Sequence, residues 1–373
     1  MQIKKVSLAH FRNYSSQSIE MAPKINMFYG ENAQGKTNIL EAIYFLSTSQ
    51  SPRTNKVQEL ISWGEQQAFI EGIFQTKNEE KRLIIQINRT GQKIIKLNQQ
   101  YLKKTSELLG LFPVIYFSPE DLEVIKKTPQ GRRRFMDVLF SQTSKKYTYH
   151  LLKYQKILKQ RNECLKQIAE KKTTPEELDA WDEALIEEGS EIVGLRKEGL
   201  KKLIVKAEEL HQELTANQEA LEIKYISSLT ENKDKAREEL KKYRRNEIIT
   251  QKTCLGPHRD DLVIMINQRE AKTYASHGQQ RTAMLSLKLA ELDYMENTFY
   301  EKPVVLLDDI LLELDSLRLA ALLKNLFQQA QTIITGTEKY LFAQAGQPEI
   351  KFYKIQKGSL AEKNETNAVE RNC

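Results

Sequence analysis

The feature that most restricts the fold of this chain is a glycine loop near its N-terminus, Gly30-Glu31-Asn32-Ala33-Gln34-Gly35-Lys36-Thr37. The loop matches the pattern G-x-x-x-x-G-K-[ST] in full. It follows an apolar, strand-like run at residues 25–29 and precedes a helix-like run that starts near Thr37. The glycines let backbone N–H groups turn toward phosphate oxygens, and the helix N-terminus adds the positive end of its dipole. The sequence therefore predicts an α/β fold that binds a nucleotide.

The last two residues of this loop have the side chains that phosphate chemistry needs. Lys36 is predicted to reach the β- and γ-phosphates, and the Thr37 hydroxyl is predicted to ligate magnesium. All eight residues from Gly30 to Thr37 are predicted to contact the nucleotide. ATP and Mg²⁺ are therefore the expected cofactors.

A second motif ends in two carboxylates. Residues 303–309 read Pro-Val-Val-Leu-Leu-Asp-Asp, and an apolar run of this kind is typical of a central parallel strand. The C-terminal end of such a strand lies beside the phosphate loop in open α/β sheets. We expect Asp308 to hold magnesium and Asp309 to orient the attacking water or act as base. The predicted catalytic residues are thus Lys36, Asp308 and Asp309.

The character of the chain changes twice along its 373 residues. Residues 1–128 contain several strand-like runs, among them 69–74, 82–88 and 93–97. Residues 129–250 have helical spacing and few glycines or prolines, and strand–helix alternation returns at 251–360. We predict a discontinuous two-lobed head (1–128 and 251–360), a helical lid inserted at 129–250, and a disordered tail at 361–373.

Charge is concentrated in one segment. Residues 126–172 carry fourteen Lys or Arg and three Asp or Glu, a local net charge of +11, whereas the whole chain has +7. A polyanion such as nucleic acid fits this segment, and a solvated helix face fits it equally well. The three cysteines show no metal-binding spacing, and neither a signal peptide nor a membrane span is visible. We therefore expect a cytoplasmic protein.

A third motif, Ser276-His277-Gly278-Gln279-Gln280-Arg281, stands at the start of a predicted helix. Ser276 can cap that helix, and Gly278 lets an anion approach the backbone. The motif resembles the S-G-G-Q signature of ABC ATPases, with His277 in the second place. The resemblance implies that Ser276, Gly278 and Gln279 complete the ATP site of a second subunit, and that Glu313-Leu314-Asp315 crosses the same dimer interface.

Further motifs resemble the RecF family of bacterial recombination-repair proteins, which have ABC-type heads related to SMC proteins. The resemblance covers nearly the whole chain and rests on these segments: 11–14 (Phe-Arg-Asn-Tyr), 30–38, 117–121 (Phe-Ser-Pro-Glu-Asp), 131–137 (Gly-Arg-Arg-Arg-Phe-Met-Asp), 256–261 (Gly-Pro-His-Arg-Asp-Asp), 276–281 and 306–315. The sequence departs from the family pattern at two places. His277 stands where the family commonly has Gln, and the stretch 310–312 is more apolar than is usual before Glu-Leu-Asp. The head fold with a helical lid follows from this resemblance.

The resemblance also implies a function. It implies a weak, DNA-stimulated ATPase that dimerises with ATP, binds double-stranded and gapped DNA, and works with RecO and RecR to load RecA at gaps. It places the protein in DNA replication, recombination and the SOS response. It implies nucleotide contacts from Asn38, Arg12 and Asn13, although Arg12 fits a strand-end charge equally well. Candidate DNA-binding residues are Arg132, Arg133, Lys145 and Lys146, and internal ion pairs are the alternative for the arginines.

Two other functions share part of these motifs. The soluble ATPase subunit of a membrane transporter would contain all three motifs, but no concentrated basic segment would be expected in it. A monomeric P-loop kinase would contain the phosphate loop, but the signature motif at 276–281 would not be expected in it. The loop containing His258 is interpreted as structural, with a metal or acid–base site as the alternative.

Overall fold

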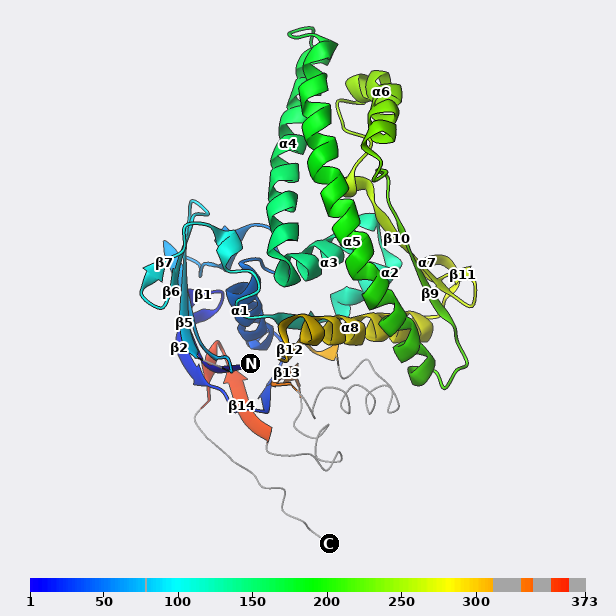
Figure 1. Ribbon diagram of the computed structural model, residues 1–373. Helices are drawn as coiled ribbons and strands as arrows, with labels where there is room; N and C mark the ends of the chain where they lie inside the picture. Colours follow the sequence, from blue (N-terminus) through cyan, green and yellow to red (C-terminus); the bar gives the residue numbers. More distant parts are fainter. Residues whose placement is uncertain (78, 311–329, 338–349, 362–373) are drawn as a thin grey trace. The chain divides into compact units, whose positions relative to one another are not determined.

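The computed structural model describes residues 1–77, 79–310, 330–337 and 350–361. The predicted Glu313–Asp315 interface segment and residues 362–373 of the predicted tail lie outside these ranges. The chain divides into two compact units (Figure 1). The first contains the described residues of Met1–Asp121 and Glu291–Cys373, and the second is Leu122–Ala290.

An antiparallel sheet of six strands, in the order β2-β1-β4-β5-β6-β7, forms one layer of the first unit. Its β4 and β5 bury every second side chain, because alternate residues of a strand point to opposite faces. The strands predicted at 69–74, 82–88 and 93–97 are confirmed. The bounds are β1 Gln2–Phe11, β2 Tyr14–Glu20, β4 Gln67–Gln75, β5 Glu80–Asn88, β6 Lys93–Leu97 and β7 Gln100–Tyr101.

A second sheet, in the order β15-β14-β3-β13-β12-β8, forms the other layer. All its pairings are parallel except the short antiparallel pair of β14 with β15. Helix α1 (Lys36–Thr48) contacts strands of both sheets and is almost wholly buried. The bounds are β3 Ile25–Tyr29, β8 Val114–Phe117, β12 Val304–Leu307, β13 Thr332–Gly336, β14 Ile350–Gln356 and β15 Ser359–Leu360.

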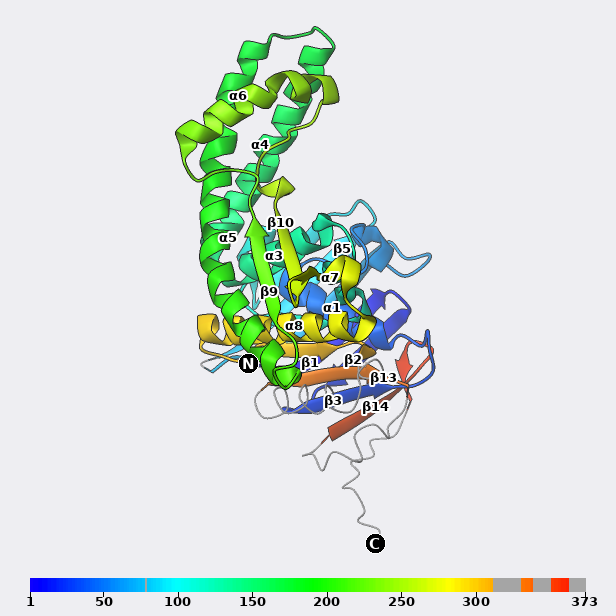
Figure 2. The same cartoon turned by 90° about the vertical axis from the view of Figure 1, so that its right-hand side faces the viewer.

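Helices dominate the second unit. Figures 1 and 2 both show α4 and α5 side by side, with α6 beyond them, and the three-stranded sheet β11-β10-β9 beside α5. The helices are α2 Glu123–Lys126, α3 Pro129–Thr143, α4 Lys145–Ala169, α5 Leu178–Leu214, α6 Lys233–Thr250, α7 Ala271–Tyr274 and α8 His277–Phe299. The strands are β9 Leu221–Ile226, β10 Asp261–Ile266 and β11 Arg269–Glu270.

The predicted insertion, residues 129–250, needs correction at both ends and in its content. It was expected to contain helices alone, but β9 lies within it. Strand β9 pairs along its whole length with β10, which was assigned to the head. This pairing keeps residues 251–290 in the second unit, whose C-terminal boundary therefore falls inside α8 rather than at 250.

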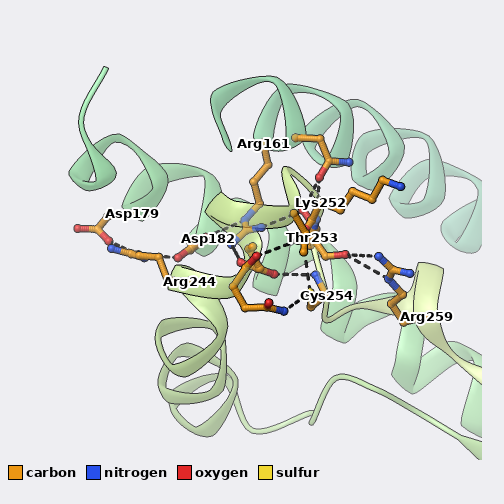
Figure 3. Close-up of polar contacts among 12 residues, drawn as sticks. Arg161, Asp179, Asp182, Arg244, Lys252, Thr253, Cys254 and Arg259 are labelled. Carbon is orange, nitrogen blue, oxygen red and sulfur yellow. Dashed lines mark hydrogen bonds and ion pairs between the residues drawn. The ribbon is translucent and has the colours of Figure 1, made fainter. Parts of the chain in front are cut away.

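A buried arginine holds three helices of the second unit together (Figure 3). The side chain of Arg161 on α4 is fully buried and donates to Asp182 of α5 at 2.8 Å and to Glu247 of α6 at 2.6 Å. It also donates to the Thr253 hydroxyl at 2.8 Å. Buried charges are stable only when they are paired and hydrogen-bonded, and Arg161 satisfies both conditions.

The loop with His258 forms a second buried polar cluster. Tyr154 hydrogen-bonds Nδ1 of His258 at 2.6 Å, while Nε2 donates to the Thr253 carbonyl at 3.0 Å. Arg196 of α5 donates to Asp260 at 2.8 Å and to Asp137 of α3 at 2.7 Å. Both ring nitrogens of His258 thus have partners inside the fold, as expected for a structural loop.

Candidate nucleotide-binding site

The phosphate loop connects β3 to α1, as predicted. Gly30 has a φ of 147° and Gly35 a φ of 112°, a region that other residues rarely adopt. A Cβ atom on Gly30 would lie 2.5 Å from the Ile355 carbonyl oxygen of β14. Both glycines are therefore required by the backbone path, which brings Lys36 and Thr37 to the first turn of α1.

Lys36 is held against its own loop. Its Nζ donates to the carbonyl oxygens of Gly30 at 2.7 Å and Glu31 at 2.8 Å. Burial lowers the pKa of Lys36, and the nearby Asp309 and Asp308 partly offset that effect. An ammonium group that is partly stripped of water and bound only to carbonyls is suited to an incoming phosphate.

Asp308 follows the last residue of β12, and its carboxylate accepts hydrogen bonds from three hydroxyl groups. Its Oδ1 accepts from Thr37 at 2.9 Å and from Thr335 of β13 at 2.7 Å, and its Oδ2 accepts from Tyr116 of β8 at 2.6 Å. Burial and Asp308 raise the pKa of Tyr116 well above its usual value, so that the phenol remains a donor. The structure thus brings together Thr37 and Asp308, which the sequence predicted as the metal ligands.

Asp309 has the features of a strained, incompletely paired acid. Its φ is 49°, and its backbone N–H donates to the Thr335 hydroxyl at 2.9 Å. Burial raises the pKa of Asp309, and the adjacent Asp308 raises it further. Among the described residues, its buried Oδ1 has no hydrogen-bond partner. A raised pKa and an open acceptor are what a general base requires.

These residues fit a magnesium nucleotide. The Thr37 hydroxyl and the Asp308 carboxylate supply the hard oxygen ligands that Mg²⁺ prefers. Lys36 supplies the phosphate-binding charge, and Oδ1 of Asp309 has no hydrogen-bond partner among the described residues, so it can still accept a hydrogen bond. When bound, Mg²⁺ would neutralise phosphate charge at this edge of the sheet.

The turn between β1 and β2 contacts the phosphate loop. Asn13 donates to the Gln34 carbonyl at 2.9 Å and accepts from Asn38 at 2.8 Å. Arg12 donates twice to the fully buried Glu41, at 2.8 and 2.7 Å, so its guanidinium is already engaged within the protein. Asn13 and Asn38 therefore lie beside the phosphate loop, and Arg12 forms an ion pair with Glu41. Their contacts with the nucleotide stay a prediction.

Three residues at this site were missed by sequence reasoning. They are Tyr116, Glu41 and Arg53, and the last donates to Asn38 at 2.9 Å. Tyr116 immediately precedes the segment 117–121 that supported the family resemblance, so its position gave a usable signal. Glu41 lies within the helix after the loop and resembles an ordinary helix residue in sequence.

The signature residues belong to the second unit. Ser276 caps α8: its hydroxyl accepts from the backbone N–H of Gln279 at 3.2 Å, and Gln279 Oε1 accepts from the Ser276 N–H at 2.9 Å. This reciprocal pair is a capping box, and it confirms the predicted cap. Gly278 lies in the first turn of the same helix.

The candidate DNA-binding residues divide into two pairs. Arg132 is buried and forms a two-nitrogen ion pair with Asp261, so its prediction as a DNA contact is corrected to an internal ion pair. Arg133 donates to the Asp260 carbonyl at 2.9 Å. Lys145 and Lys146 are exposed at the start of α4, where Lys146 pairs with Glu191 at 2.7 Å.

Comparisons with known proteins agree with this geometry. The RecF/RecN/SMC N terminal domain family matches residues 2–360. An Smc head bound to the C-winged helix domain of ScpA is similar in fold, with a TM-score of 0.56 at 16% identity over 98% of both chains. The phosphate loop follows β3 and Asp308 follows β12, with β13 between these two strands of one parallel sheet. The fold is that of an ABC/SMC-type ATPase head.

Closer relatives define the family. The chain is 40% identical to the DNA replication and repair protein RecF of Clostridium tetani, over 97% of this chain and 100% of that protein. It is 40% identical to the RecF of Enterococcus faecalis, over 98% and 100%. A solved structure of the recombination mediator protein RecF with ATP in the RecFOR pathway has a TM-score of 0.89 at 37% identity, covering 96% of both chains. The chain belongs to the RecF family.

Proposed function

We propose that this protein is an ATP-dependent DNA-binding protein of recombinational repair that acts in the cytoplasm. ATP with Mg²⁺ binds at the phosphate loop, and the bound nucleotide joins two copies of the chain. The observation that carries this proposal is the convergence of Lys36, Thr37, Asp308 and Asp309 on one edge of the parallel sheet. The RecF relative solved with ATP supports the choice of nucleotide.

Each residue of the site has a distinct role in the proposal. Lys36 neutralises charge on the terminal phosphates, and Thr37 with Asp308 holds magnesium. Asp309 orients the attacking water and accepts its proton, because a raised pKa makes its carboxylate a better base. Tyr116 and Thr335 fix the Asp308 carboxylate through their hydroxyl groups. Hydrolysis in this scheme is slow and is stimulated by DNA.

The proposed dimer uses the cap of α8. Ser276, Gly278 and Gln279 of one copy close over the terminal phosphate at the phosphate loop of the other. The helix N-terminus and the capped backbone N–H groups suit an anion. Loss of that phosphate on hydrolysis removes contacts made only in the closed state, so the nucleotide acts as a switch.

The proposed ligand is double-stranded or gapped DNA, bound mainly through its phosphates. In this proposal the protein works with RecO and RecR to load RecA at single-strand gaps. The names of the RecF relatives and of the RecFOR pathway structure support this assignment. They also favour repair over the alternative of an ATPase subunit for a membrane transporter. No described helix is long and apolar enough to cross a membrane.

Light scattering with and without ATP, with DNA binding measured in parallel, tests the proposal. The wild-type chain should double in mass on ATP addition and then bind DNA. Ser276→Arg should keep nucleotide binding but lose the mass change, because its bulk and charge block the interface. Lys36→Met should lose both responses. If Lys36→Met still dimerised and bound DNA normally with ATP, the proposal would be wrong.

A further inference from the structure

One face of α4 in the second unit is basic over residues 145–159, before the exposed Glu163 follows on the same side. The side chains at 145, 149, 152, 156 and 159 follow alternating steps of four and three residues, so they lie on one side of the helix. All five are exposed, and none is acidic. We name these residues the α4 stripe: Lys145, Tyr149, Leu152, Lys156 and Lys159.

The other sides of α4 are already committed to the fold. Buried side chains, including those of Tyr147, Tyr154 and Arg161, form its inner face. Two further lysines pair with carboxylates of α5: Lys146 with Glu191 at 2.7 Å and Lys153 with Glu188 at 2.8 Å. The three lysines of the α4 stripe have no ion pair with any described carboxylate. The helix thus has exposed lysines that pair with carboxylates of α5 and exposed lysines without such a pair.

The α4 stripe also contains two apolar side chains at unusual exposure. Tyr149 is 57% exposed and Leu152 is 44% exposed. The Lys153 ammonium lies 4.9 Å from the Tyr149 ring centroid, a cation–π contact that helps to hold the ring in place. An exposed aromatic ring between lysines offers both a stacking face and phosphate-binding charge.

The composition of the α4 stripe favours nucleic acid over protein. Protein–protein interfaces have apolar, tightly packed centres from which lysine is depleted. Phosphate contacts, in contrast, come mainly from Lys, Arg and hydroxyl side chains. The distance from Lys145 to Lys159 along the helix is about 21 Å at about 1.5 Å per residue. Duplex DNA presents a negative charge about every 1.7 Å of its axis, so one straight helix face can meet several phosphates.

We propose that the α4 stripe is a DNA-contacting surface. Lys145, Lys156 and Lys159 bind backbone phosphates, and Tyr149 stacks on an unpaired base where the duplex gives way to a single strand. This inference rests on the proposed function, because it locates the DNA contact that the proposed function requires. It places the contact on one helix face rather than on the arginines at 132 and 133, which are used inside the fold.

A triple variant, Lys145→Gln, Lys156→Gln and Lys159→Gln, tests the phosphate contacts. Its affinity for a gapped duplex with ATP should fall about 10- to 100-fold near ~0.1 M salt, and the slope of log affinity against log salt should decrease by about 3. The matched control replaces three exposed lysines of α5 and α6: Lys201→Gln, Lys202→Gln and Lys242→Gln. The control should keep the wild-type slope, and both variants should keep ATP-dependent dimerisation.

The outcomes separate this inference from the proposed function. If the wild-type chain binds no DNA with ATP, both the proposed function and the α4 stripe fail. If the wild-type chain binds DNA and the triple variant binds equally well, the α4 stripe is wrong and the proposed function stands. If the control weakens binding as much as the triple variant, overall charge is responsible and the α4 stripe is again wrong.

Tyr149→Ala tests the stacking contact separately. The variant should lose about 5- to 100-fold in affinity for gapped DNA and much less for an intact duplex, because stacking requires an unpaired base. Tyr149→Phe keeps the ring and should bind as the wild type does. An equal loss on gapped and intact DNA, or no loss on either, would remove Tyr149 from the proposed contact.

Discussion

Two regions of this protein, one in each unit, differ in how their buried charges are partnered. In the second unit, the guanidinium of Arg161 is surrounded by two carboxylates and a hydroxyl, so its charge is balanced and its donors are used. At the phosphate loop, Lys36 is bound only to carbonyls, and Asp309 keeps a buried oxygen without a partner among the described residues. Buried ions of the first kind hold helices together, whereas those of the second kind are ready to bind a ligand.

The difference has a thermodynamic meaning. A buried ion with complete partners is costly to break, because removing one partner leaves the other charge uncompensated. A buried ion with incomplete partners reduces stability until a ligand completes it, and stability is often lower at such functional sites. Substitutions should therefore affect activity at the phosphate loop and folding at Arg161.

The largest effect is expected at Lys36. Lys36→Ala should lower the rate of ATP hydrolysis about 1,000-fold, because it removes the charge that stabilises the transferring phosphate. It should leave the free energy of unfolding unchanged or slightly higher, because burial already lowers the pKa of this ammonium. ATPase assays and urea unfolding without nucleotide measure the two quantities. A marked loss of stability in Lys36→Ala would contradict the view that Lys36 serves ligand binding rather than folding.

Arg161→Met should have the reverse pattern. The substitution leaves Glu247 buried without the Arg161 cation and removes one of the arginines that donate to Asp182, which costs about 3–5 kcal/mol of the free energy of unfolding. ATP hydrolysis by the folded fraction should remain near the wild-type rate. Urea unfolding at pH 7.5 measures the stability loss.

A combined variant provides the control for Arg161. Arg161→Met with Asp182→Leu and Glu247→Leu removes all three of these buried charges, and Arg244 keeps its ion pair with Asp179. Its stability should recover most of the loss, because apolar replacements of buried ion clusters are commonly neutral or stabilising. If the combined variant is less stable than Arg161→Met, the carboxylates have further partners that matter more than the arginine.

The sequence was most informative where function requires local patterns. The phosphate loop and the run ending in Asp308 are contiguous motifs, so they predicted Lys36, Thr37 and the two acids correctly as neighbours. The carboxylate partner Tyr116 is 192 residues away from Asp308. The segment after Tyr116 could draw attention to that region, but local spacing could not pair Tyr116 with Asp308, because it does not specify the order of strands in a parallel sheet.

The same limit explains the errors in the second unit. Strand β9 is short and lies between the long helices α5 and α6, and its partner β10 comes only after α6. A short strand of this kind is easily read as part of a helical region. Arg132 failed for a related reason: its partner Asp261 is 129 residues away, so the arginine run looked like a free basic patch.

Acid should weaken the second unit through His258. Burial lowers the pKa of His258 to about 4, and Arg259 and Arg133 add to the effect. An unfolded chain binds a proton at this residue below pH ~6.5, while the folded chain does so only near pH 4. The His258 contribution is therefore fully present above pH ~6.5, and it is lost at about 1.4 kcal/mol per pH unit as the pH falls toward 4.

Urea unfolding at pH 7.5 and 5.0 measures this contribution. The wild type should lose about 2 kcal/mol more than His258→Gln between the two pH values. Glutamine keeps an acceptor for Tyr154 and does not titrate, so it serves as the reference. Parallel pH profiles for the two proteins would show that His258 binds its proton in the folded state as readily as in the unfolded chain, and the prediction would be wrong.

The smallest effect is expected for an arginine that pairs with the residue next to Asp182. Arg237 of α6 donates to Glu183 of α5 at 2.9 Å, so it joins the same two helices as the Arg161 cluster. Here both side chains are largely exposed, 39% for Arg237 and 55% for Glu183. Water and salt screen such pairs, and two long side chains lose entropy when they meet. Arg237→Ala should therefore unfold at the wild-type urea midpoint within error, although it removes an ion pair one residue along the helix from a critical one. A clear loss would mean that burial is not what distinguishes these two arginines.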